Sequence, residues 1–116
     1  DKPMANTIKL KTDTADGTTK TTVYTVQAST TTICIGCTLA NIHATANIEA
    51  DVQIVTAASS GENGDDVYII KGVPVPNKSS LEIIEGKIVL LTGDAIKCRS
   101  NTASSIDIAL SVLEQT

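Results

Sequence analysis

The sequence predicts an all-β protein: an antiparallel, jelly-roll-like β-sandwich of about eight or nine short strands. Two observations favour this fold class. First, 17 Thr, 14 Ile and 9 Val make up 40 of the 116 residues, and β-branched side chains favour extended backbone. Second, apolar residues alternate with polar ones in short runs, and turn-forming residues separate these runs about every 8–12 positions. Apolar residues nowhere keep a helical spacing for three turns.

The expected strands follow one another along the whole chain. They cover residues 7–12, 19–27, 32–40, 47–56, 67–71, 81–84, 87–91, 95–100 and 105–113. Gly, Asp, Asn and Ser gather between them, as in the turn at residues 13–17. Pro74 and Pro76 cannot donate hydrogen bonds to a strand ladder, so residues 72–76 are expected at an edge or corner. The pattern allows one short helical turn, at residues 41–46.

Alternation also predicts which side chains share a face of each strand. The expected inward sets are Ile33, Ile35, Cys37 and Leu39 in the third strand, Ile48, Ala50, Val52 and Ile54 in the fourth, and Ile106, Ile108, Leu110 and Val112 in the last. In the first strand, Ile8 and Leu10 lie on one face and Lys9 and Lys11 on the other. With Lys20, these two lysines are interpreted as a solvated, edge-protecting face rather than a phosphate site.

The length of the chain predicts one domain. Met4 and Ala5 read like a natural start, so we expect residues 1–3 to be a tag remnant and residues 4–116 to form a single sandwich. No apolar run approaches the roughly 20 residues that span a bilayer, so no membrane partner is expected. A net charge of -4 and an aromatic content of 2% argue against nucleic acid, which needs basic stripes and stacking platforms.

Three cysteines cannot all pair, which favours folding in a reducing compartment. Cys34 and Cys37 form a C-x-x-C, a spacing that zinc sites and redox pairs use. Within a strand, however, residues three apart point to opposite faces, and only Cys98 and His43 remain as further ligands. Packed strand cysteines are therefore the favoured interpretation, and no cofactor or metal is expected.

Other candidate catalytic or metal-binding residues are isolated. The only histidine, His43, lies in an expected loop, and the sequence has no G-x-S-x-G nucleophile motif. Glu62, Asp65 and Asp66 form an oxygen-rich loop that calcium could occupy, although a solvated hairpin tip explains it as well. Glu82 and Glu85 have the residue types of a glycosidase pair but no aromatic cleft around them. We therefore expect no enzymatic activity.

Four apolar residues break the expected inward pattern: Val73, Val75, Ile84 and Leu113. Apolar side chains off the inward register are candidates for a subunit interface. This predicts a homo-oligomer with cyclic symmetry, a trimer being one option.

Residues 22–114 carry a resemblance to a known group of proteins. The matching segments include TTTICIGCTLAN at 30–41, VYIIKGVPVP at 67–76, SLEIIEGKIVL at 80–90 and SNTASSID at 100–107. The chain resembles short virion proteins of tailed bacteriophages, abundant among marine and cyanobacterial phages, and departs from them at Cys34 and Cys37. The resemblance implies a structural part of the particle: a capsid decoration or cement protein, a neck or tail adaptor, or a fibre-attachment module.

That resemblance also implies partners and a location. The partners would be other capsid or tail proteins, and the protein would fold in the host bacterial cytoplasm before entering the virion. The alternative interpretation is a carbohydrate-binding β-sandwich module, for which only Tyr24 and Tyr68 are available to stack on a sugar.

Overall fold

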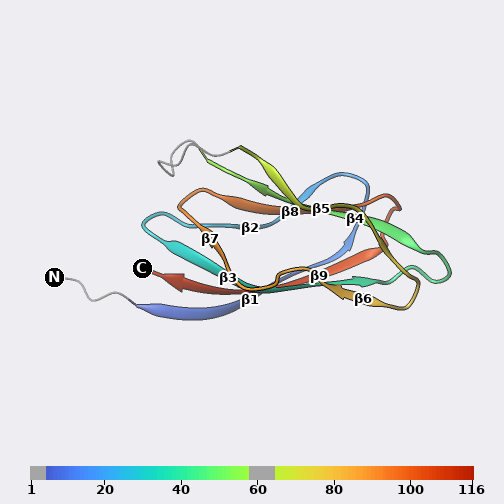
Figure 1. Ribbon diagram of the computed structural model, residues 1–116, viewed down its shortest axis with the longest axis horizontal. Coiled ribbons are helices and arrows are strands. Elements are labelled where there is room, and N and C mark those ends of the chain that lie inside the picture. The colour runs from blue at the N-terminus through green and yellow to red at the C-terminus, as the bar shows by residue number, and fades with distance from the viewer. Residues whose placement is uncertain (1–4, 58–64) are drawn as a thin grey trace.

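The computed structural model describes residues 5–57 and 65–116. It confirms an all-β sandwich: across the described residues, nine strands form two antiparallel sheets and no helix is present. Figure 1 shows the two sheets as two layers, with the start of β1 and the C-terminus at the same end of the long axis. The molecule is elongated, with principal extents of 55 × 26 × 21 Å.

The first sheet has the order β1-β9-β3-β6, and β7 also pairs with β3. Its strands are β1 (Asn6–Asp16), β9 (Ile106–Gln115), β3 (Thr31–Asn41), β6 (Ser80–Glu82) and β7 (Ile88–Leu90). The second sheet has the order β2-β8-β4-β5. Its strands are β2 (Thr21–Thr25), β8 (Ala95–Ser100), β4 (Ile48–Val55) and β5 (Val67–Val75).

This strand order is that of a jelly roll. Successive strands pass from one sheet to the other with two exceptions: β4 and β5 are neighbours in the second sheet, and β6 and β7 share one position beside β3. β5 forms the edge of the second sheet and includes Pro74, as expected for a strand containing a residue without an N–H. The strand is longer than predicted because Gly72, at a φ of 64°, accommodates an irregularity in its pairing with β4.

The core lies between the two sheets. The inward faces predicted for the fourth and last strands are confirmed for Ile48, Ala50, Val52, Ile106, Ile108, Leu110 and Val112. Val75 and Ile84 also lie in this core, so neither offers an exposed surface to a partner subunit. Val75 pairs opposite the buried Ile48, which carries it to the inward side of β5.

The predicted face of the third strand is wrong over its first half. Thr32 and Cys34 point inward there, whereas Ile35 is 42% exposed. A bulge between Cys34 and Gly36, opposite Ser111, then shifts the alternation by one residue and returns Cys37 to the core. Cys34 and Cys37 therefore share the buried face instead of pointing to opposite sides.

Residues 41–46 do not form the predicted helical turn: Asn41 ends β3, and residues 42–46 form an irregular loop. The buried Asn41 side chain donates hydrogen bonds to the carbonyl groups of Ala46 and Val75, both at 2.9 Å. Nδ1 of His43 accepts the backbone N–H groups of Thr45 and Ala46 at 3.1 and 2.9 Å. These side chains give the backbone of the loop hydrogen-bond partners that replace those of a helical turn, as polar residues in loops commonly do.

Candidate functional site: an apolar face on the outside of the first sheet

β1 turns its lysines toward the sandwich interior and its aliphatic side chains toward solvent. Ile8 and Leu10 are 74% and 65% exposed. Lys9 reaches inward and places Nζ 2.7 Å from Oε1 of Glu114, and Lys11 Nζ lies 5.9 Å from the centre of the Tyr24 ring. The predicted solvated lysine face is therefore wrong for Lys9. This orientation is the reverse of what core packing alone would favour.

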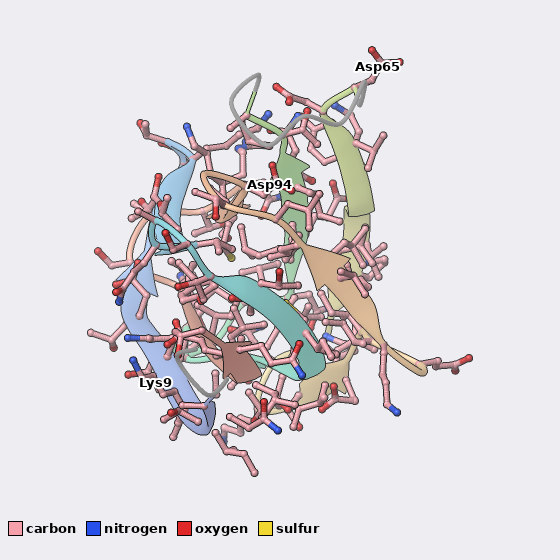
Figure 2. The ribbon with its side chains drawn as sticks, turned by 90° about the vertical axis from the view of Figure 1, so that its left-hand side faces the viewer. Lys9, Asp65 and Asp94 are labelled. Atoms are coloured by element: carbon pink, nitrogen blue, oxygen red, sulfur yellow. The ribbon has the colours of Figure 1, made fainter. Side chains whose placement is uncertain are left out.

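A buried carboxylate accounts for the inward lysines. Glu114 on β9 is 4% exposed, and its Oε2 accepts a hydrogen bond from the Tyr24 hydroxyl at 2.5 Å. Hydrogen bonds from Lys9 and Tyr24 hold the pKa of Glu114 below its usual value, while burial raises that of Tyr24 to about 12. A buried charge needs a paired partner, so this network fixes which face of β1 points inward. Figure 2 looks onto this end of the sandwich, with Lys9 on β1.

The outward side chains of four strands form one continuous apolar row. Strand pairing places Ile8 opposite Leu113, Leu113 opposite Ile33, and Ile33 opposite Val89. Val89 is 60% exposed. Leu10 and Ile35 extend the row on either side of Ser111, which pairs with Leu10 and lies opposite the bulge. We call this set the outer apolar face: Ile8, Leu10, Ile33, Ile35, Val89 and Leu113.

Toward the other end, the same side of the sheet becomes polar. Thr12, Ala109, Thr38 and Glu82 form a second cross-strand row. Glu82 accepts the Cys37 N–H at 2.7 Å and the Thr38 hydroxyl at 2.6 Å, and these hydrogen bonds hold its pKa below the usual value. The outer side of the first sheet thus combines an apolar region with a polar border.

Only Leu113 of the four predicted interface residues belongs to this face. Val73 is half-buried and lines a groove of about 470 Å³ between β5 and the β6–β7 segment. Ile84 also lines that groove, although its side chain is almost wholly covered. Ile8, Leu10, Ile33 and Val89 were not singled out from the sequence, because each fits the alternation of its own strand and only the pairing register brings them together.

The other candidate sites do not come together. Glu82 is held by the Cys37 N–H and the Thr38 hydroxyl at the edge of the first sheet, and Glu85 lies exposed in the bend between β6 and β7. Glu62 lies outside the described residues, and Asp66 accepts the Thr56 N–H at 2.9 Å. The buried Asp94, labelled with Asp65 in Figure 2, accepts backbone N–H groups of Ala57 and Leu91. In residues 5–57 and 65–116, no three His, Cys, Asp or Glu side chains form a metal-binding group.

The cysteines give a testable prediction about reactivity. Burial raises the pKa of Cys34 to about 11 and that of Cys37 to about 12, and Cys98 is fully buried. Because the thiolate is the reactive form, we expect a disulfide-exchange reagent at mildly alkaline pH to leave the native thiols essentially unlabelled. All three should react promptly in denaturant. Fast labelling of native Cys34 or Cys37 would show that the bulge region opens to solvent.

Comparisons with known proteins add no family: no family model, no curated protein and no solved structure matches the chain. A search of the described residues for a helix of sufficient length and apolarity to cross a bilayer finds none.

Proposed function

We propose that this protein is a structural subunit of a tailed-phage particle, acting by contact and assembling with a second copy through its outer apolar face. The observation that carries the proposal is the row Ile8, Leu113, Ile33 and Val89. The largest contiguous apolar patch on the surface of a protein often marks an interaction site, and patches larger than a few hundred Å² are rare on monomers.

The chemistry of the rest of the surface indicates which partner covers this face. The second sheet carries Lys97, Gln53 and Tyr68 side by side on its outside, so its centre is polar. Of the two sheet surfaces that the structure describes, the first therefore carries the apolar row. The same row on a second copy is a chemically matching partner for it. A patch that pairs with its own copy makes a two-fold, isologous contact. This favours a dimer over the trimer that the sequence also allowed.

The size of the sheet fits a stable pair. Four strands at about 4.8 Å spacing are roughly 19 Å wide, and the ten residues of β9 span about 34 Å. Contact over this whole face would cover about 650 Å² on each copy, or roughly 1,300 Å² in total, within the range of specific interfaces. Its apolar region and polar border match the usual arrangement of an interface core and rim.

The assignment to a phage particle is supported by the resemblance of residues 22–114 to short virion proteins. A particle repeats the same contact many times, and linked copies bind more tightly than any single contact would. An elongated sandwich with a self-complementary face suits a decoration, neck or tail component, whose partners would be other particle proteins.

The dimer is tested by measuring the native mass in sedimentation experiments at high micromolar concentration. We expect twice the mass of the chain for the native protein and a monomer for Ile8→Lys, because the new charge would be buried in an apolar contact. The matched control is Val67→Lys, which adds the same charge at an exposed apolar residue outside the face, and it should stay dimeric.

Several outcomes would overturn parts of the proposal. A native monomer would contradict the proposed interface, and a trimer would contradict the two-fold contact. If Val67→Lys dissociated the protein as much as Ile8→Lys does, the added charge alone would explain the dissociation. Mass spectrometry of purified particles of the phage that encodes the chain tests the virion assignment separately. Absence of the chain from these particles would contradict it.

A further inference from the structure

Basic side chains gather around Tyr68 on the outside of the second sheet. Gln53 on β4 pairs with Lys97 on β8 and with Tyr68 on β5. Lys20, which precedes β2, crosses β8 and places Nζ 2.8 Å from Oε1 of Gln53 and 2.5 Å from the Tyr68 hydroxyl oxygen. Nζ of Lys20 and Nζ of Lys71 lie 4.6 and 4.5 Å from the centre of the Tyr68 ring. We call these five residues the lysine–tyrosine cluster.

The nearby carboxylates form no ion pair with the lysines of this cluster in the part of the chain that the structure describes. Asp51 is buried, and it already binds the Arg99 guanidinium and the Gly72 N–H, each at 2.6 Å. Glu49 lies one outward position beyond Asp51 on β4 and is therefore further from Gln53. None of the three lysines forms an ion pair with any other residue that the structure describes. The concentration of positive charge occurs on a chain whose net charge is -4, so it is local and not a general property of the surface.

The groups within the cluster are arranged to meet a negatively charged ligand. The Tyr68 oxygen accepts a hydrogen bond from one ammonium group and lies close to a second, and both lower the pKa of this phenol. Two cations that converge on one neutral oxygen repel each other, and a bound oxyanion between them would relieve that repulsion. Charge-assisted hydrogen bonds from ammonium groups to carboxylate or sulfate oxygens are among the stronger polar contacts.

We propose that the lysine–tyrosine cluster binds an acidic oligosaccharide that carries carboxylate or sulfate groups. Lys20 and Lys71 would hold one oxyanion, Lys97 a second, and the Gln53 carboxamide and the Tyr68 hydroxyl would contact sugar hydroxyls. The side chains of the cluster meet over three adjacent strands, β8, β4 and β5, which are about 10 Å across, and this exceeds the size of a single ion. Tyr24 is buried in the core, where it hydrogen-bonds Glu114, so Tyr68 is the ring available at the described surface.

The same observations favour an acidic sugar over other polyanions. A single-stranded nucleic acid needs successive aromatic platforms along its path, and this face offers one ring. A protein interface normally centres on apolar or aromatic anchors in a desolvated pocket, whereas the single ring of this cluster, Tyr68, is surrounded by ammonium groups. The site lies on the sheet opposite to the outer apolar face, so it does not depend on the proposed dimer.

The test is calorimetric titration of the native protein at low ionic strength. The probes are a short polygalacturonate, a heparin-derived hexasaccharide, neutral maltohexaose, an oligothymidylate and inorganic sulfate. We expect at least one charged sugar to bind and maltohexaose not to bind. The double variant Lys20→Gln/Lys71→Gln should bind about tenfold more weakly, since it removes two charge-assisted contacts. Tyr68→Phe keeps the ring and should weaken binding a few-fold.

The matched control is Lys78→Gln/Lys87→Gln, which removes the same charge from two exposed lysines elsewhere and should bind within about twofold of the native protein. Four results would each overturn the proposal. The control could weaken binding as much as the double variant, or the oligothymidylate could bind more tightly than the sugars. Sulfate could bind as tightly as the sugars, or neither charged sugar could bind. The preference between the two charged sugars distinguishes carboxylate from sulfate as the recognised group. Repeating the titration with Ile8→Lys keeps the result separate from dimer formation.

Discussion

Leu110→Ala is expected to lower the free energy of unfolding by about 3–5 kcal/mol. Leu110 is fully buried on β9, the strand between β1 and β3, and pairs with Lys11 on one side and Cys37 on the other. The substitution removes three buried carbon atoms and leaves a cavity that the sheet cannot close by moving, because β9 is held on both edges. Urea denaturation followed by circular dichroism measures the loss.

The matched control is Leu113→Ala, the same change three residues further along the strand. Leu113 points outward and pairs with Ile8 and Ile33, so we expect its removal to cost about 1 kcal/mol or less in folding and to weaken the dimer. The unfolding of both variants is measured in the Ile8→Lys background, so that association does not add to the apparent stability, and the effect of Leu113→Ala on the dimer is measured without that substitution. Similar losses for the two variants would show that β9 does not separate a core side from an outer side.

The second large effect is expected when the Lys9–Glu114 pair is broken. Lys9→Met leaves the Glu114 carboxylate buried with Tyr24 as its remaining partner, and we expect a loss of about 3 kcal/mol near neutral pH. Glu114→Gln removes the charge itself but can still accept the hydrogen bond from Tyr24, so its loss should be smaller, about 1–2 kcal/mol. Glu85→Gln removes an exposed charge elsewhere and should have almost no effect.

The pH dependence of these losses has a definite sign. The pKa of Glu114 is lower in the folded protein than its usual value of 4.5. A carboxyl group of this kind stabilises the fold fully above its unfolded-state pKa, and the contribution is lost as pH falls through the folded-state pKa. The difference in unfolding free energy between the native protein and Glu114→Gln should therefore stay constant above about pH 5.5 and shrink as the pH falls below 4.5. A difference that grows in acid would contradict the network.

The strands that could be predicted best are those with strict alternation and well-marked turns. β8 has the predicted bounds, and the buried residues of β4 and β9 follow from period-two patterning, because one side of each of these strands packs against the other sheet. The last strand extends two residues beyond its prediction, to Gln115. Glu114 lies in this extension and takes an inward position that alternation alone would assign to an apolar residue.

The bulge in β3 and the orientation of β1 could not be predicted in the same way. Gly36 is a local signal that a bulge could occur between Cys34 and Cys37, but the shift itself is defined by the pairing of Gly36 with Ser111 on a strand 75 positions away. Similarly, β1 alternates as predicted, but a pattern of two faces does not say which one is buried. That choice depends on Glu114 meeting Lys9 across the sheet.

The sequence by itself determined the fold class, the approximate strands and the alternation within most of them, because these depend on local backbone preference and on the two-residue period of a strand. The tertiary structure alone decided which side of β1 faces the core, and it brought Ile8, Leu113, Ile33 and Val89 into one row and Lys20, Lys71 and Tyr68 into one cluster. The physical reason is that strand register joins residues far apart in the chain, and a shift of one position would turn each side chain to the opposite face.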